Sequence, residues 1–265
     1  MLIRRIASAL VLAPPVLLAV WWGRPAFEAM IALATAIMAY EWARLCEGGR
    51  IGLAGWALVA VALAIVSVAI WFGATASLLA MLAGVVIVHI AGHAEGVEEP
   101  RWLTLGVGAV GAPCAALIWL RADAADGLAT CLWLIATVWA TDIGAYFAGR
   151  AIGGPRLAPS ISPKKTWAGL AGGMVSAGLV GWATALIVNE ADVVVLVPLG
   201  AALAVVAQIG DLSESGFKRH FGVKDAGRLI PGHGGLLDRV DGLITTAPAV
   251  ALLSWLAGRS VVQWP

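Results

Sequence analysis

The chain has 265 residues, of which 61% are hydrophobic and 12% are charged, and its formal net charge is +1. A soluble domain carries about a quarter charged residues, so this composition excludes an ordinary soluble fold, and the near-zero net charge gives no sign of nucleic-acid binding. Runs such as 51–72 lack the polar stripe that a soluble helix bundle needs. The sequence therefore predicts an all-α, polytopic integral membrane protein.

Apolar segments follow one another along the chain with mostly short polar breaks between them. Each is long enough to cross about 30 Å of hydrocarbon as a helix. We predict about nine transmembrane helices, at residues 6–23, 26–46, 51–72, 74–92, 102–121, 127–149, 167–189, 193–211 and 236–258. Because no long linker sets a span apart, we expect one membrane domain over 1–265. Residues 1–125 carry no recognisable motif, and the functional residues lie in 126–265.

The basic residues predict how the chain is oriented in the membrane. With the N-terminus in the cytoplasm, only Arg24, Arg121 and Arg259 of the 17 Lys and Arg residues lie outside, and Arg239 lies near the cytoplasmic mouth of the last span. Segments 150–166 and 211–235 then form two basic loops on the cytoplasmic side. Because both loops open on the same side, they can meet there.

Four aspartates lie where an apolar span does not require them. Asp142 lies within the sixth span, Asp211 ends the eighth, and Asp238 and Asp241 begin the ninth on one helix face. An ionised carboxylate in a bilayer costs several kcal/mol unless it is paired or binds a metal. An ion pair between helices, such as Asp142 with Arg239, would explain one acid alone, but four acids beside basic loops favour a metal site. Oxygen ligands without a Cys/His cluster suit Mg²⁺, or Mn²⁺, rather than zinc.

The two basic loops have features that are typical of phosphate binding. The run SPKKT at 162–166 directly precedes the seventh span, and the start of a helix offers unpaired amide N–H groups to an anion. In the second loop His233 is surrounded by glycines, which let the backbone approach a phosphate closely. Anchoring of the lysines at the lipid head groups, and a plain hydrogen-bonding role for His233, are the alternatives.

The segment from Ser215 to Asp241, SGFKRHFGVKDAGRLIPGHGGLLDRVD, resembles the signature of the phosphatidate cytidylyltransferases, the CDP-diacylglycerol synthases, at each fixed position. The run at 162–166 and the WATD sequence that ends at Asp142 resemble further elements of that family more loosely. The first four spans match nothing in it.

The resemblance implies that CTP and phosphatidic acid react, with Mg²⁺, to give CDP-diacylglycerol and pyrophosphate. It also implies a homodimer in a bacterial-type inner (plasma) membrane, with the active site facing the cytoplasm. The lipid phosphate is itself the nucleophile, so catalysis is mostly positioning and charge neutralisation. The metal ligands expected from it are Asp211 and Asp238, supported by Asp142 and Asp241. The expected catalytic residues are Asp211, Asp238, Asp241, His233, Lys218, Arg219 and Lys224, and those expected to bind substrate phosphates are Ser162, Lys164, Lys165, Thr166, Arg239, Gly234 and Gly235.

Three other functions compete with this one. A CTP-dependent polyprenol or phytol kinase would share the architecture but needs a general base for its alcohol acceptor, and the 27-residue match argues against it. A transporter could use Asp142 and Asp211 as an ion pathway, but the sequence has no inverted repeat. An inactive scaffold would have no reason to keep the acids and lysines.

Overall fold

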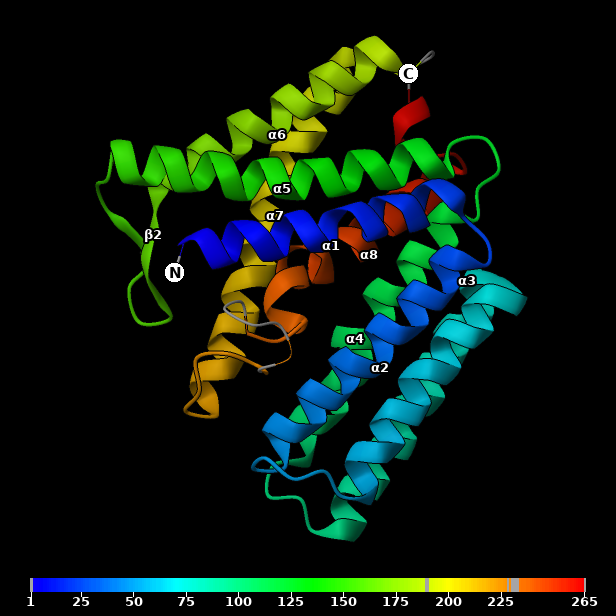
Figure 1. Ribbon diagram of the computed structural model, residues 1–265. Helices are drawn as coiled ribbons and strands as arrows, with labels where there is room; N and C mark the ends of the chain where they lie inside the picture. The colour runs from blue at the N-terminus through cyan, green and yellow to red at the C-terminus, as the bar shows by residue number, and fades with distance from the viewer. Residues whose placement is uncertain (1, 189–190, 228, 230–233, 265) are drawn as a thin grey trace. The chain divides into compact units, whose positions relative to one another are not determined.

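The computed structural model describes residues 2–188, 191–227, 229 and 234–264, and of residues 2–10 the backbone alone. The helices are α1 (Leu2–Trp22), α2 (Ala26–Cys46), α3 (Leu53–Glu95), α4 (Pro100–Arg121), α5 (Gly127–Ala151), α6 (Trp167–Ile187), α7 (Val193–His220), α8 (Leu237–Ala257) and the short 3-10 helix η1 (Val261–Gln263) (Figure 1). A two-stranded antiparallel sheet, β1 (Arg156–Ala158) and β2 (Ser162–Thr166), precedes α6. In the described part of the chain, seven helices are long and apolar enough to cross a membrane. The predicted all-α, polytopic architecture is confirmed, and the count of nine stays a prediction.

The long helix α3 contains the two spans predicted at 51–72 and 74–92. Gly73 interrupts it with non-helical dihedral angles (φ 81°, ψ −172°). The carboxylate of Glu95, at the end of α3, accepts hydrogen bonds from the N–H groups of Leu53 (2.9 Å) and Ala54 (2.5 Å) at its start. The two ends of α3 therefore lie together, and the chain reverses direction at Gly73.

Helix α7 ends nine residues later than predicted. The sequence places the end of this span at Asp211 and a loop over 211–235, but the helix continues to His220. Glu214 and Lys218, four residues apart, form an ion pair with N···O 2.5 Å, and Phe217 is buried. A Glu followed by Lys at this spacing stabilises a helix, so the polar residues extend α7. The loop prediction is wrong for residues 211–220.

The chain divides into two compact units, and the first comprises Met1–Ala122 and His220–Val240. Its helices approach closely: the Trp42 ring donates Nε1–H to the Trp102 carbonyl (2.8 Å), and a Cβ added at Gly106 would lie 2.6 Å from the same ring. Arg121, at the end of α4, donates to the carbonyls of Val20 (2.7 Å) and Trp21 (3.2 Å) and so satisfies the last turn of α1. The contacts of the Trp42 ring hold α2 against α4, and those of Arg121 join α4 to α1.

The second unit comprises Asp123–Arg219 and Asp241–Pro265. Glycines let α5 and α6 meet backbone to backbone, since a Cβ added at Gly172 would lie 2.8 Å from the Gly144 carbonyl. Helices α7 and α8 are joined by the Thr245 hydroxyl, which donates to the Val206 carbonyl (2.8 Å). A Cβ added at Gly210 would lie 2.6 Å from the Asp241 carbonyl. The two acidic positions, Asp211 and Asp241, therefore flank a close helix contact.

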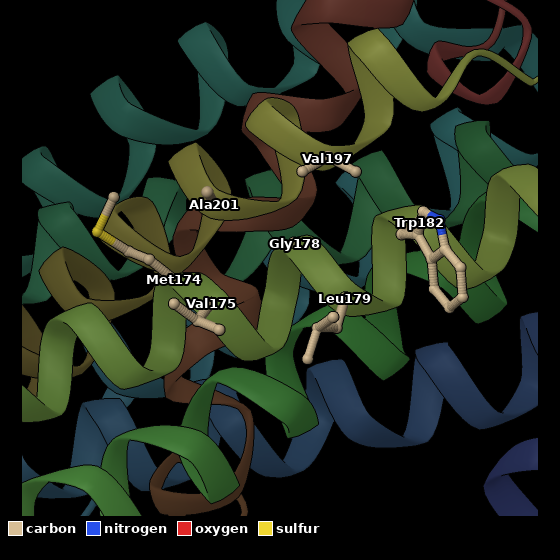
Figure 2. A pocket seen from close by; sticks show the side chains of 7 residues that line it. All are labelled: Met174, Val175, Gly178, Leu179, Trp182, Val197 and Ala201. Carbon is tan, nitrogen blue, oxygen red and sulfur yellow. The ribbon is translucent and has the colours of Figure 1, made fainter.

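An apolar cavity of about 650 Å³ lies against α6 and α7 in the second unit. Figure 2 shows the side chains that line it, which are those of Met174, Val175, Gly178, Leu179, Trp182, Val197 and Ala201. None of these seven residues is charged, so the cavity offers nothing to a phosphate. It suits a hydrocarbon chain.

Candidate active site

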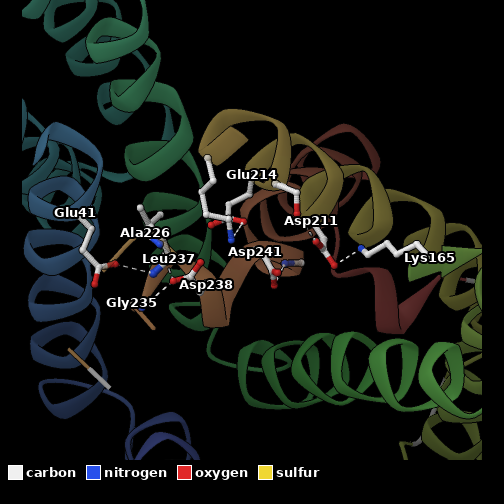
Figure 3. Close-up of polar contacts among 12 residues, drawn as sticks. Glu41, Lys165, Asp211, Glu214, Ala226, Gly235, Leu237, Asp238 and Asp241 are labelled. Atoms are coloured by element: carbon white, nitrogen blue, oxygen red, sulfur yellow. Dashed lines mark hydrogen bonds and ion pairs between the residues drawn. The ribbon is translucent and has the colours of Figure 1, made fainter. Parts of the chain in front are cut away.

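Acidic side chains from neighbouring helices gather in the second unit, together with a lysine (Figure 3). Asp211 of α7 forms an ion pair with Lys165 of β2 and accepts a hydrogen bond from the Ser215 hydroxyl (3.3 Å). Asp241 of α8 lies within electrostatic range of Asp211, Asp142 and Lys165. Two further predicted acids and one predicted cation thus lie within electrostatic range of Asp241.

The ion pair at Asp211 is partly shielded from solvent. The Lys165 and Asp211 side chains are 20% and 26% exposed. An interaction of this kind is stronger than an exposed surface pair, and removing one partner leaves a charge that is poorly solvated. The cluster therefore combines carboxylate oxygens and one cation in a partly buried setting.

The β1–β2 hairpin delivers Lys165 to the cluster. Ala158 is paired with Ser162 and Arg156 with Thr166. Successive side chains of a strand point to opposite faces, and accordingly Lys164 is exposed while Lys165 is half-buried. The lysines that the sequence predicts as a pair of phosphate ligands thus lie in different environments.

Thr166 is the N-cap of α6, and its side chain accepts a hydrogen bond from the Gly169 N–H (3.0 Å). The Trp167 N–H donates to the Pro155 carbonyl (3.1 Å). The expectation of unpaired amides at this helix start is wrong for these two groups, because threonine is a strong N-cap and the hairpin supplies a carbonyl. Their hydrogen-bonding capacity is already used within the protein.

The end of α7 presents a polar face beside Asp211. Residues 211, 214, 215 and 218 recur at intervals of three and four, which places them on one side of the helix. Glu214, which the sequence analysis did not single out, is 3% exposed and pairs with Lys218, which is 12% exposed. Arg219 is exposed. The structure gives Lys218 a partner in its own helix, and its catalytic role stays a prediction.

Asp238, in the first unit, lies three residues before the end of the segment that carries the signature. Its side chain is buried, and Oδ2 accepts the N–H groups of Ala226 (2.9 Å) and Gly235 (2.7 Å) (Figure 3). Gly234 has φ +87°, and a Cβ added there would lie 2.6 Å from the same oxygen. One carboxylate oxygen thus ties together both ends of the segment 226–235. Asp211 belongs to the other unit, so a metal shared by Asp211 and Asp238 stays a prediction.

Glu41 of α2 is a residue that sequence reasoning missed. It is 4% exposed, its Oε1 accepts the Leu236 N–H (3.0 Å), and its Oε2 accepts the Leu237 N–H (2.9 Å). The available signal was an ionisable residue inside an apolar span, which is costly without a partner. The sequence could have raised Glu41 as a candidate, but it could not have named its partners.

A second cavity, of about 630 Å³ and mixed polarity, lies in the first unit between the turn after α2 and the segment 221–227. Arg44 and Lys224 both line it, so it combines two cations with a size typical of small-ligand sites. Its other lining residues are Leu45, Gly48, Gly49, Phe221, Val223, Asp225, Ala226 and Gly227. Arg239 is exposed, and the predicted His233 lies outside the described residues.

Glu99 forms a polar cluster on the surface of the first unit, next to Phe221. Its Oε1 contacts His220 Nε2 at 2.9 Å, and its Oε2 accepts from Arg101 Nη2 at 2.8 Å. The hydrogen bond from Arg101, followed by that from His220, lowers the pKa of Glu99. This cluster holds the chain where α7 ends, beside the ring of Phe221, which contacts His220 at 5.0 Å between centroids.

The acids of the second unit meet the requirements of Mg²⁺. Among the described residues, no three His, Cys, Asp or Glu side chains are grouped closely enough to hold a metal by themselves. Mg²⁺ does not need such a cage, since it usually binds one or two carboxylates, waters and substrate phosphates. Asp211 and Asp241 are hard oxygen donors of the kind that Mg²⁺ prefers, and Asp211 also pairs with the Lys165 ammonium. The donor set fits the ion that the sequence predicts.

Comparison with known proteins gives matches over nearly the whole chain. The model of the cytidylyltransferase family matches residues 3–257. The chain is 39% identical over 252 residues to a phosphatidate cytidylyltransferase of Brucella suis, covering 94% of this chain and 91% of that protein. It is 38% identical over 271 residues to a phosphatidate cytidylyltransferase of Pseudomonas aeruginosa, covering 97% and 98%. One of Rickettsia bellii is 32% identical over 263 residues, covering 95% and 90%.

Proposed function

The chain belongs to the cytidylyltransferase family, and we propose that it transfers the cytidylyl group of CTP to phosphatidic acid, giving CDP-diacylglycerol and pyrophosphate. Relatives that cover more than nine-tenths of the chain bear the name phosphatidate cytidylyltransferase. One structural observation carries the proposal: Lys165 reaches Asp211 from a hairpin 46 residues earlier in the chain. A cation and a carboxylate thereby share one place where the apolar part of α7 ends, and a cation there can neutralise charge between two anionic substrates.

In the proposed reaction an oxygen of the lipid phosphate attacks the α-phosphorus of CTP. The bond from that phosphorus to the oxygen bridging to the β-phosphorus breaks, and the electron pair leaves with pyrophosphate. The protein needs no nucleophile of its own, so its side chains act by orientation and by neutralising charge. Lys165 faces the phosphates, while Asp211 holds the lysine in place.

Mg²⁺ belongs to the proposal as a cofactor, with Asp211 and Asp241 as ligands and Asp142 in support. When bound, the ion would neutralise charge on the triphosphate. Mn²⁺ has the same preference for oxygen ligands. The mixed-polarity cavity at Arg44 and Lys224 has the charge and size for the nucleotide, and the apolar cavity of the second unit has the lining for an acyl chain.

The decisive experiment uses purified protein with phosphatidic acid, Mg²⁺ and CTP labelled at either the α- or the γ-phosphate. The proposed transferase places the α-label on the lipid, and mass spectrometry identifies CDP-diacylglycerol. Transfer of the γ-label alone would instead identify a lipid kinase and refute the proposal.

The proposal includes a multi-pass location in a bacterial-type inner membrane, with the N-terminus and the active site in the cytoplasm, and a homodimeric assembly. The three native cysteines are buried, so Lys164→Cys provides one exposed thiol for labelling. A membrane-impermeant maleimide should label it in inside-out vesicles and not in intact cells; the reverse pattern would overturn the orientation. Mass measurement of the detergent-solubilised protein tests the homodimer.

A further inference from the structure

The carboxylate of Glu41 lies at the start of α8, although Glu41 belongs to α2. Its two oxygens accept the N–H groups of Leu236 and Leu237 at 3.0 and 2.9 Å. Leu237 is the first residue of α8 and Leu236 directly precedes it, at the end of the helix where N–H groups have no internal partners. Glu41 therefore acts as an N-cap supplied by a different helix, with a negative charge at the positive end of the helix dipole.

Glu41 also explains two glycines of the signature segment. A Cβ added at Gly227 would lie 2.4 Å from Glu41 Oε1, and one added at Gly235 would lie 2.5 Å from the same atom. No Cβ tolerates such a distance, so Glu41 occupies the space that side chains at both positions would need. From the sequence, we interpret the glycine at position 235 as allowing a phosphate to approach the backbone closely. The structure gives a different reason for a glycine there, which is that Glu41 packs directly against it.

The contacts of Glu41 join directly to those of Asp238. Asp238 Oδ2 holds the N–H groups of Ala226 and Gly235, and Glu41 holds the next two amides after Gly235. Figure 3 shows the two side chains reaching the same short stretch of backbone. The segment is thus fixed by carboxylates on two different helices.

We infer that Glu41 is a positioning residue of the cytidylyl transfer site: it sets the place of Gly227 and of residues 235–237, and through them of Asp238, by hydrogen bonds to Leu236 and Leu237 and by contact with Gly227 and Gly235. This inference rests on the proposed function for its meaning in catalysis. The local anchoring stands on the geometry alone.

The test compares Glu41→Gln with a matched control, Glu95→Gln. The first substitution keeps the shape of the side chain but replaces one acceptor oxygen with an amide donor, so only one of the two N–H groups keeps its partner. Glu95 makes the same kind of contact, with the amides of Leu53 and Ala54 at the start of α3, and lies outside the signature segment. Any general loss from uncapping a helix should appear in both variants.

Two measurements decide the matter. In hydrogen exchange of the full-length protein, Glu41→Gln should speed exchange of the Leu236 and Leu237 amides about tenfold, and Glu95→Gln should not affect them. In the transfer assay, kcat per folded molecule should fall about 10- to 100-fold in Glu41→Gln and less than about threefold in Glu95→Gln. A residue with a merely structural role would reduce the amount of folded enzyme and leave kcat per folded molecule unchanged.

A second pair of variants covers a failure of Glu41→Gln to fold. Gly235→Ala pushes on the carboxylate from the other side and should also lower kcat. Glu41→Asp keeps the charge but withdraws the oxygens by one methylene from the Leu236 and Leu237 amides, so it should lower kcat as well. Equal kcat in Glu41→Gln and Glu95→Gln, unchanged exchange at Leu236 and Leu237, or unchanged kcat in both Gly235→Ala and Glu41→Asp would overturn the inference. Absence of transfer in the unmodified protein would refute the proposed function, while the exchange result would still decide whether Glu41 anchors the segment.

Discussion

The contact between α5 and α6 should be intolerant of a single methyl group at Gly172. A Cβ at this position would lie 2.2 Å from the Ala148 Cβ and 2.8 Å from the Gly144 carbonyl. Carbon atoms prefer a separation of about 3.5–4.0 Å, so the helices must separate by more than about 1 Å. Neither obstacle can rotate away, because one is backbone and the other is a methyl group.

The expected cost of Gly172→Ala follows from this overlap. Overpacking of a tight interior typically destabilises a protein by about 1–3 kcal/mol, which corresponds to a fall of about 2–12 °C in the unfolding midpoint. Activity should also fall, because α6 directly follows β2, which carries Lys165, and α5 carries Asp142. A displacement of about 1 Å between reacting groups can cost about 100-fold in rate.

A matched control lies six residues further along α6. A Cβ at Gly178 would meet Val197 at 3.5 Å, which is an ordinary contact, so Gly178→Ala should be accepted. Alanine in a helix interior is more favourable than glycine by about 0.5–1 kcal/mol, so the midpoint should stay or rise. Thermal unfolding in detergent measures both variants, and the CTP transfer assay measures Gly172→Ala. If Gly172→Ala matches Gly178→Ala in stability, the reasoning from close helix packing is wrong.

Further predictions concern the site itself. Asp211→Asn and Lys165→Met should each lower the transfer rate about 100-fold or more while the protein still accumulates in the membrane; substantial turnover in either variant would contradict their roles. A chelator should abolish activity and Mg²⁺ should restore it, whereas zinc should not; full activity after chelation would remove the metal from the mechanism. Lys224→Met should raise KM for CTP and leave KM for phosphatidic acid unchanged; equal shifts in both would reject the nucleotide cavity. The pKa of Glu99 is lowered in the folded protein, so its stabilising effect is present above its ordinary pKa and is lost as pH falls through the lowered value. Glu99→Gln should therefore make the free energy of unfolding depend less on pH in the acid range. An unchanged dependence would argue against the Glu99 cluster.

Much of the helix architecture could be predicted from local sequence signals. Apolar length predicts the spans, and Gly73 lies at the break expected between the third and fourth of them. The end of α7 could not be predicted in the same way. Hydropathy falls at Asp211, but the helix continues because Glu214 pairs with Lys218 and Phe217 is buried. A loss of apolar character marks where a helix leaves the membrane core and does not mark where it stops.

For the candidate site too, some features could be predicted from the sequence and others could not. Its charged residues could be identified from the sequence, since carboxylates and lysines in apolar surroundings are costly and therefore informative. Their assignment to contacts was not: Thr166 caps α6, and Lys164 and Lys165 diverge because they occupy successive positions of a strand. Both depend on the β1–β2 hairpin, which the sequence analysis treated as a loop.

By itself, the amino-acid sequence determined the membrane-spanning class, the family resemblance and the types of functional side chain present. Each of these depends only on composition or on the spacing of neighbouring residues. Tertiary structure alone decided that Asp211 meets Lys165, and that Glu41 meets amides 195 and 196 residues away. Such pairings arise because a buried charge and an unpaired helix terminus each cost free energy until they satisfy one another. Which of the many possible partners does so depends on how the helices pack, and no local pattern records it.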